Sequence, residues 1–296
     1  MNANTTETAP VITVNMILDR YQRDGMDDLA PSTAKNYAYH IRHLRKAFGE
    51  RIAADLKPRD FGPWLDVKRG EGLAHRVRGL AVLSAAFTMA VSRWYYLELN
   101  VLRQVKRPEF PPRRRLIQDA EYRALRAMAP FRMQLAMDLA VLTGQRQGDI
   151  LDFKWSAIRE EMVDGRKVPY LHVEQGKTKK RLAIEVTPDL ERVLDECWML
   201  PGGGKYGSEY VLPNRYGHRY TGAGFRQNWQ KLRLKWEANG GVPAHFHDLR
   251  ALAATKCSSL VEAQLLLGHS TPNLTARVYR MSTDRVRPLS MSVIQP

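Results

Sequence analysis

A short proline-rich, basic stretch near the middle of the chain limits how the rest can fold. Residues 103–115 read RQVKRPEFPPRRR, with three prolines, six basic residues and a single acid. Proline lacks a backbone N–H and blocks both helix and central strand, so no regular element can run through this stretch. The sequence therefore predicts an extended cationic linker at 106–116. A chain of 296 residues can place a separate core on each side of it.

The charge balance indicates a polyanionic partner. There are 46 Lys and Arg residues against 31 Asp and Glu, a formal net charge of +15. An excess of this size favours nucleic acid, with a basic protein that has no such partner as the alternative. The two cysteines, Cys197 and Cys257, lie far apart in the sequence and have no zinc-ligand spacing, which favours a reduced, cytosolic protein without a zinc site of this kind. No signal peptide and no run of 18 apolar residues occurs, which predicts a cytoplasmic protein without a membrane partner.

The part before the linker is predicted to be a small helical domain over 11–105, preceded by a disordered N-terminus at 1–10. Two apolar stripes recur there at helical spacing. They comprise Tyr37, Ile41, Leu44 and Phe48, and then Leu80, Leu83, Phe87, Ala90 and Trp94. Basic residues lie off these stripes and in the linker, where they are candidate DNA phosphate contacts, with solvated surface charge as the alternative. The candidates are Lys35, Arg42, Arg45, Lys46, Arg76, Arg78, Arg113, Arg114 and Arg115.

The part after the linker, 117–296, mixes the two kinds of secondary structure. In KVPYLHVEQGKTKKRLAIEV apolar residues alternate with period two on both sides of a turn that contains glycine. This pattern predicts a β-hairpin. The remaining apolar segments have helical spacing. The expected fold class is therefore mainly α with a small β-sheet, in two domains.

Five short motifs in this second part occur in a characteristic order. They are TGQRQGDILDFKW, EQGKTKKRLAI, HDLR, LGHS and a following tyrosine. Together they resemble the tyrosine recombinase family, which includes the phage integrases and Xer-type recombinases. The resemblance extends over nearly the whole chain. It implies an N-terminal helical, SAM-like core-binding domain and a C-terminal α+β tyrosine-recombinase catalytic domain.

The resemblance also implies a function. We expect a site-specific DNA recombinase of the prophage or mobile-element integrase kind, independent of metal and ATP. It would cleave and rejoin double-stranded DNA through a 3′-phosphotyrosyl intermediate and a Holliday junction, as a homotetramer on DNA at the nucleoid. Accessory DNA-bending or directionality factors are further candidate partners. The alternatives are a Xer-like dimer resolvase and a non-catalytic, sequence-specific DNA-binding protein on the same scaffold.

The family pattern assigns catalytic roles to six residues: Arg146, Lys177, His247, Arg250, His269 and Tyr279. A tyrosine phenol can attack a phosphodiester and conserve it as another ester. Planar guanidiniums match the charged oxygens of the transition state through paired donors. A lysine on a hairpin turn can protonate the leaving 5′-oxygen. Lys179 and Lys180 lie near enough in sequence to remain alternatives for that acid.

The two histidines and one acid complete the expected site. The resemblance makes His247 a base or hydrogen-bond donor and His269 a donor to the phosphate. Asp149 is expected to orient an active-site arginine rather than to catalyse. The stretch from Arg250 to His269 is shorter than is usual in the family, and Tyr279 lies one residue farther from His269 than in the commonest pattern. Because about ten residues precede 11, we expect no arm-binding domain of the kind that larger phage members carry.

Overall fold

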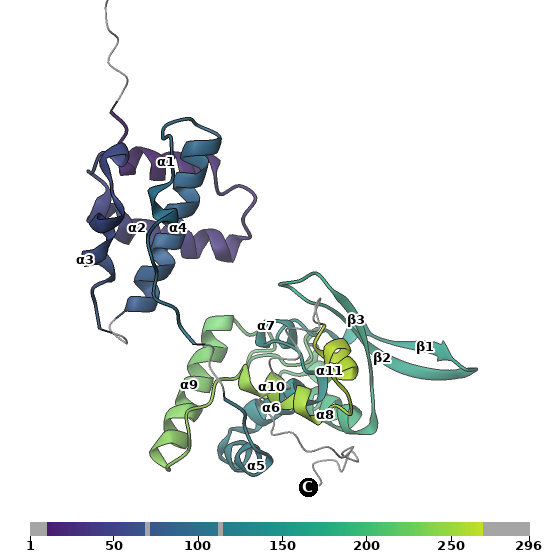
Figure 1. Cartoon of the computed structure of the whole chain (residues 1–296). Coiled ribbons are helices and arrows are strands. Elements are labelled where there is room, and N and C mark those ends of the chain that lie inside the picture. The colour runs from purple at the N-terminus through teal and green to yellow at the C-terminus, as the bar shows by residue number, and fades with distance from the viewer. Residues whose placement is uncertain (1–10, 69–71, 112–114, 269–296) are drawn as a thin grey trace, which may run out of the picture. The chain divides into compact units, whose positions relative to one another are not determined.

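The computed structural model describes residues 11–68, 72–111 and 115–268, and the chain divides into two compact units, Met1–Pro112 and Arg113–Pro296. Each unit is largely helical, and one three-stranded sheet lies in the second (Figure 1). The expected fold class, mainly α with a small sheet, is confirmed. In the described part of the chain no helix is long and apolar enough to cross a membrane.

The first unit is a helical bundle with its own core. Its α-helices are α1 (Val14–Asp24), α2 (Pro31–Phe48), α3 (Gly62–Leu65) and α4 (Leu73–Ser92), with short 3-10 turns at Ala53–Asp55, Pro58–Phe61 and Val101–Arg103. The stripes predicted from the sequence face this core. Ile41 and Leu44 of α2 and Leu80, Leu83 and Phe87 of α4 are at most 1% exposed. The helical period of the sequence thus accounts for the packing of α2 against α4.

Three histidines, His40, His43 and His75, meet between α2 and α4. The rings of His40 and His75 stack with centroids 4.5 Å apart, and the His43 ring lies 4.9 Å from that of His75. Nδ1 of His40 and Nε2 of His75 are buried and have no hydrogen-bond partner. Burial lowers the pKa of both His40 and His75, and the neighbouring histidine and the Arg78 guanidinium lower it further. Both imidazoles are therefore held neutral in the folded state.

The second unit surrounds a buried central helix, α6. Its α-helices are α5 (Asp119–Met128), α6 (Phe131–Thr143), α7 (Gln147–Ile150), α8 (Pro188–Trp198), α9 (Gly222–Ala238), α10 (Asp248–Lys256) and α11 (Leu260–Leu267). Nine of the thirteen residues of α6 are buried, and α10 and α8 pack against it. A helix that is apolar on all sides belongs inside a unit, and this position fixes where its C-terminal end lies.

The sheet contains one strand more than the sequence predicted. Strands β1 (Ile158–Val163), β2 (Arg166–Glu174) and β3 (Arg181–Glu185) pair antiparallel in chain order. The predicted β2–β3 hairpin is confirmed. Strand β1 was missed because five of its six residues are exposed, so it shows no apolar alternation. The signal that could have revealed it is the Asp164-Gly165 turn, in which both residues have positive φ as a tight hairpin requires.

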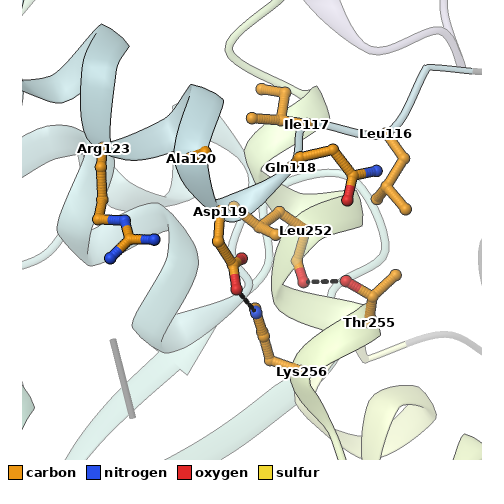
Figure 2. A pocket seen from close by; sticks show the side chains of 9 residues that line it. All are labelled: Leu116, Ile117, Gln118, Asp119, Ala120, Arg123, Leu252, Thr255 and Lys256. Carbon is orange, nitrogen blue, oxygen red and sulfur yellow. Dashed lines mark hydrogen bonds and ion pairs between the residues drawn. The ribbon is translucent and has the colours of Figure 1, made fainter. Parts of the chain in front are cut away.

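The beginning of α5 is attached to the C-terminal half of α10. Lys256 of α10 forms an ion pair with Asp119 of α5. Figure 2 shows the shallow pocket between these elements. The contact holds α10 at one end, while the other end of the same helix carries His247 and Arg250.

We predict that acidification destabilises the first unit through its histidine cluster. Below the ordinary histidine pKa of 6.5, the unfolded chain binds more protons than the folded chain. The stability contributed by neutral His40 and His75 is therefore present above that pH and is lost as the pH falls. Hydrogen exchange of α2 and α4 in the full chain, followed between pH 7.5 and 5, should show earlier opening at low pH. His75→Gln should flatten this dependence, whereas His218→Gln should not; equal effects of the two substitutions would contradict the prediction.

Candidate active site

Arg146 is placed by the way in which α6 ends. The Thr143 hydroxyl donates to the carbonyl oxygen of Leu139 at 2.6 Å, and Gly144 ends the helix with φ 64°. A side chain at Gly144 would come within 3.1 Å of the Leu266 and Leu267 side chains, so both the conformation and the space favour glycine. Arg146 then stands at the start of α7 with a side chain that is 22% exposed.

Arg250 lies deeper than Arg146 and binds two backbone carbonyls. It is 4% exposed. Its Nη1 donates to the carbonyl oxygen of Gly144 at 2.6 Å, and its Nη2 donates to that of Leu267 at 2.5 Å. Burial lowers its pKa to about 10, with a further contribution from the Arg146 guanidinium. Arg250 therefore remains a cation at neutral pH, although it is largely removed from water.

His247 stands at the N-terminal end of α10, one turn from Arg250. Its side chain reaches the surface. Desolvation by the surrounding protein is nevertheless the largest cause that lowers its pKa, and the charge of Arg250 is the second. Arg146 and Lys177 lower the pKa further, and Asp248 opposes them. The neutral imidazole that results can accept a proton or a hydrogen bond.

Lys177 occupies the turn between β2 and β3, as the motif predicts, and its side chain is exposed. The turn is closed by two backbone hydrogen bonds of 2.8 Å. Gln175 N–H donates to the carbonyl oxygen of Lys180, and Lys179 N–H donates to that of Gln175. Lys179 has positive φ and Lys180 stands at the base of the turn. The Lys177 charge is one of those that lower the His247 pKa.

Asp149 connects the Arg146 segment to the hairpin turn. It is 7% exposed. Its Oδ1 accepts a hydrogen bond of 2.8 Å from the Gly176 N–H, and its Oδ2 lies 3.8 Å from Nη1 of Arg146. The expected partnership with an arginine is thus accompanied by a shorter contact to the backbone beside Lys177.

Two glutamines that were not singled out from the sequence lie at the centre of this site. Gln145 and Gln175 are 1% and 0% exposed, and the Gln175 amide donates to Oε1 of Gln145 at 2.7 Å. Arg146 Nη1 donates to Oε1 of Gln175 at 3.0 Å. Gln145 lies within the TGQR motif and Gln175 within the EQGKT motif. The only sequence signal for their role was their position beside the catalytic candidates Arg146 and Lys177. Residue type gave none, because glutamine is usually a surface residue.

Some residues predicted to contact DNA phosphates already have partners within the chain. Arg45 forms an ion pair of 2.7 Å with Asp19, and Arg115 one of 2.7 Å with Glu121. Arg76 Nη1 donates to the carbonyl oxygen of Trp64 at 3.1 Å, and its guanidinium lies over the Trp64 indole ring. The side chains that remain exposed on α2 and α4 are Lys35, Arg42, Lys46 and Arg78.

Four further residues named from the sequence cannot be placed. Arg113, Arg114, His269 and Tyr279 lie outside the described residues. Within the described ranges, no group of three or more His, Cys, Asp or Glu side chains could hold a metal ion. The site is therefore composed, as far as it is described, of two arginines, one histidine, one lysine and a buried polar network.

Known proteins resemble this chain in sequence. The phage integrase family matches residues 113–285. The integrase of Escherichia phage HK022 is 29% identical over 296 residues, which cover 94% of this chain and 78% of that integrase. The integrase of Escherichia phage lambda is 27% identical over 93% of this chain and 77% of its own length.

Solved structures resemble it as well. A lambda integrase dimer bound to a COC′ core site superposes with a TM-score of 0.77 at 27% identity, covering 96% of this chain and 100% of that one. A lambda integrase tetramer bound to a Holliday junction gives 0.78 at 26% identity, covering 95% and 81%.

The helical first unit, the second unit and its cationic cluster define a tyrosine site-specific recombinase, as the motifs had suggested. The family match extends over more than half of the sequence. The chain belongs to the phage integrase family.

We predict that Arg250 is also a stabilising residue of the second unit. Arg250→Ala removes both donors and leaves the Gly144 carbonyl oxygen without the partner it has at 2.6 Å, which should cost about 1–3 kcal/mol in the free energy of unfolding. Arg250→Lys should recover only part of this, because a lysine cannot reach two carbonyls with one planar fork. Urea unfolding of the full chain measures the effect. Arg181→Ala, at an exposed ion pair, is the control, and an equal loss in that variant would contradict the prediction.

Proposed function

We propose that this chain is a phage-type integrase that cleaves and rejoins double-stranded DNA through a 3′-phosphotyrosyl bond. The observation that carries the proposal is that hydrogen bonds tie Arg146, Arg250 and the Lys177 turn to one buried network: Gln175 contacts Arg146 and Thr178, and Arg250 binds the carbonyl oxygens of Gly144 and Leu267. A concentration of positive charge at one site is suited to a phosphodiester, whose transition state spreads negative charge over its oxygens.

In the proposed reaction the Tyr279 phenolic oxygen attacks the phosphorus atom and the bond to the 5′-oxygen breaks. The phosphate is conserved as a tyrosyl ester, so a 5′-hydroxyl of another strand can attack it in turn and release the tyrosine. Arg146 and Arg250 would bind the non-bridging oxygens in both directions. Arg250 suits this role because its position is fixed by two carbonyls before substrate binds.

Protons must leave the attacking phenol and reach the departing 5′-oxygen. We assign the second transfer to Lys177, which lies on an exposed turn within electrostatic reach of the site. Neutral His247 is suited to accept the first proton, or to bind a phosphate oxygen after protonation. His269 would supply a further donor, and Asp149 would hold the Arg146 segment and the turn in register.

The assembly we propose follows the relatives. A homotetramer would act on DNA, as the lambda integrase does in its Holliday-junction structure. We propose that 11–105 acts as the core-binding domain, 106–116 as the linker and 117–296 as the catalytic domain. Four exposed side chains of the first unit would contribute phosphate contacts: Lys35, Arg42, Lys46 and Arg78. Because the proposed substrate is genomic DNA, the place of action would be the nucleoid in the cytoplasm.

The alternatives are less well supported. The relatives that match over 93–94% of this chain at 27–29% identity are phage integrases, which favours an integrase over a Xer-like dimer resolvase. A non-catalytic DNA-binding protein would have no need to hold Arg146 and Arg250 in one buried hydrogen-bond network beside the Lys177 turn.

We predict that Tyr279→Phe abolishes covalent attachment to DNA and leaves DNA binding intact, because only the attacking oxygen is removed. A core-site DNA with a nick beside the cleavage point traps the intermediate, and a denaturing gel detects it. The unmodified chain should form the adduct. An adduct of undiminished yield with the Phe variant would exclude Tyr279 as the nucleophile.

A second prediction separates the acid from the clamp. A substrate whose bridging 5′-oxygen is replaced by sulfur leaves as a thiolate and hardly needs protonation, since help from a general acid depends on the basicity of the leaving group. This substrate should restore cleavage by Lys177→Ala strongly and by Arg146→Ala little. Restoration of Lys179→Ala or Lys180→Ala instead would move the acid to that lysine.

A further inference from the structure

Gln175 is completely buried and uses both ends of its amide. It is 0% exposed. Its Oε1 accepts hydrogen bonds from Arg146 Nη1 at 3.0 Å and from the Thr178 hydroxyl at 2.7 Å. Its Nε2 donates to Oε1 of Gln145 at 2.7 Å and to the carbonyl oxygen of Leu267 at 3.0 Å. Four partners satisfy the hydrogen-bonding capacity of one amide group.

These partners belong to three separate parts of the second unit. Arg146 and Gln145 follow α6, Thr178 lies in the β2–β3 turn, and Leu267 ends α11. The contact to Thr178 bears on Lys177, because Lys177 is the residue immediately before Thr178 in the chain. Whatever holds Thr178 therefore also limits where the Lys177 backbone can lie.

The end of α11 is fitted closely around the same amide. The carbonyl oxygen of Leu267 accepts from both Gln175 and Arg250. A side chain at Gly268 would come within 2.7 Å of the Gln175 amide. Gln175 thus contacts Arg146 directly, shares the Leu267 carbonyl with Arg250 and belongs to the turn that carries Lys177. It has no exposed surface to offer a substrate.

We propose that Gln175 is a positioning residue that fixes the Arg146 guanidinium and the Lys177 turn relative to one another, so that both reach the same phosphate. This role depends on the proposed recombinase function. Acting through Arg146 and Lys177 alone, Gln175 never touches the DNA. A neutral amide suits the position, since it restrains Arg146 without cancelling the positive charge that the phosphate needs.

Two substitutions separate the contacts. Gln175→Leu has a similar size and removes all four hydrogen bonds. Gln175→Glu keeps the acceptor for Arg146 and Thr178, loses the donor to both Gln145 and Leu267, and places a negative charge beside Arg146. Gln134→Leu is the matched control, because Gln134 is a partly buried glutamine that donates to the carbonyl oxygen of Ala129 at 2.9 Å. Neither Gln175 nor Gln134 is assigned to bind the phosphate.

The measurement is the single-turnover rate of covalent adduct formation by the full-length chain, with DNA binding and thermal unfolding measured in parallel. Displacing reactive groups by about 1 Å can cost on the order of 100-fold in rate, so Gln175→Leu should slow cleavage of ordinary DNA by about 10- to 100-fold. DNA affinity should remain close to that of the unmodified chain. Gln134→Leu should cleave normally.

The substrate with a bridging 5′-sulfur tests the coupling directly. It should restore part of the rate of Gln175→Leu, because misplacement of Lys177 no longer matters. It should restore little in Gln175→Glu, where the turn is still held by Thr178 and the loss comes from the Arg146 side. The effect of Gln175→Leu should also be smaller when Lys177→Ala is already present, as expected for residues that act together.

Several outcomes would overturn the positioning role. One is an unchanged cleavage rate in Gln175→Leu. Another is a loss of cleavage rate in Gln175→Leu that is the same on ordinary and 5′-sulfur DNA, and the same whether or not Lys177→Ala is present. Together with a lower unfolding temperature, this result would show general destabilisation. If the unmodified chain forms no adduct at all, the proposed function fails and the positioning role fails with it. An adduct from the unmodified chain together with a normal rate in both Gln175 variants removes the positioning role alone.

Discussion

The second unit depends on a buried guanidinium held by the ends of two helices. Removing a charged group from water is costly unless it is fully hydrogen-bonded. Arg250 meets this demand with the carbonyl oxygens of Gly144, where α6 ends, and Leu267, where α11 ends. Both are helix C-termini, whose unsatisfied carbonyls and dipoles favour a cation. The interaction that makes burial of Arg250 tolerable therefore also joins α6, α10 and α11.

The joined helix ends explain where the reactive groups lie. Arg146 comes two residues after Gly144, and His247 stands one turn before Arg250. Burial is the main cause of the lowered pKa of both His247 and Arg250, and repulsion from neighbouring guanidiniums, Arg250 and Arg146 for His247 and Arg146 for Arg250, lowers it further. A phosphate placed among them would relieve that repulsion. The site is therefore preorganised for an anion. Packing elsewhere in the unit offsets the free-energy cost of holding its positive charges together.

The sequence was informative wherever a pattern is local. Helical periodicity identified the faces of α2 and α4 that are buried, alternation identified β2 and β3, and the order of motifs identified the family. It did not identify the partners of single side chains. Three arginines predicted to contact phosphates have partners within the chain that no local pattern specifies: Arg45 has Asp19, Arg76 has Trp64 and Arg115 has Glu121. Gln145 and Gln175 were missed because burial of a glutamine is decided by tertiary contacts.

The choice of neutral side chains around the arginines has a physical reason. A carboxylate in contact with each guanidinium would hold it more strongly than an amide does and would compete with the phosphate for the same donors. Asp149 keeps its Oδ2 at 3.8 Å from Arg146, and its shorter contact goes to the Gly176 N–H. Gln175 takes the nearer position, at 3.0 Å. Its neutral hydrogen bond restrains the guanidinium in the free protein and can be exchanged at modest cost, so that Arg146 can bind the phosphate during cleavage and release it afterwards.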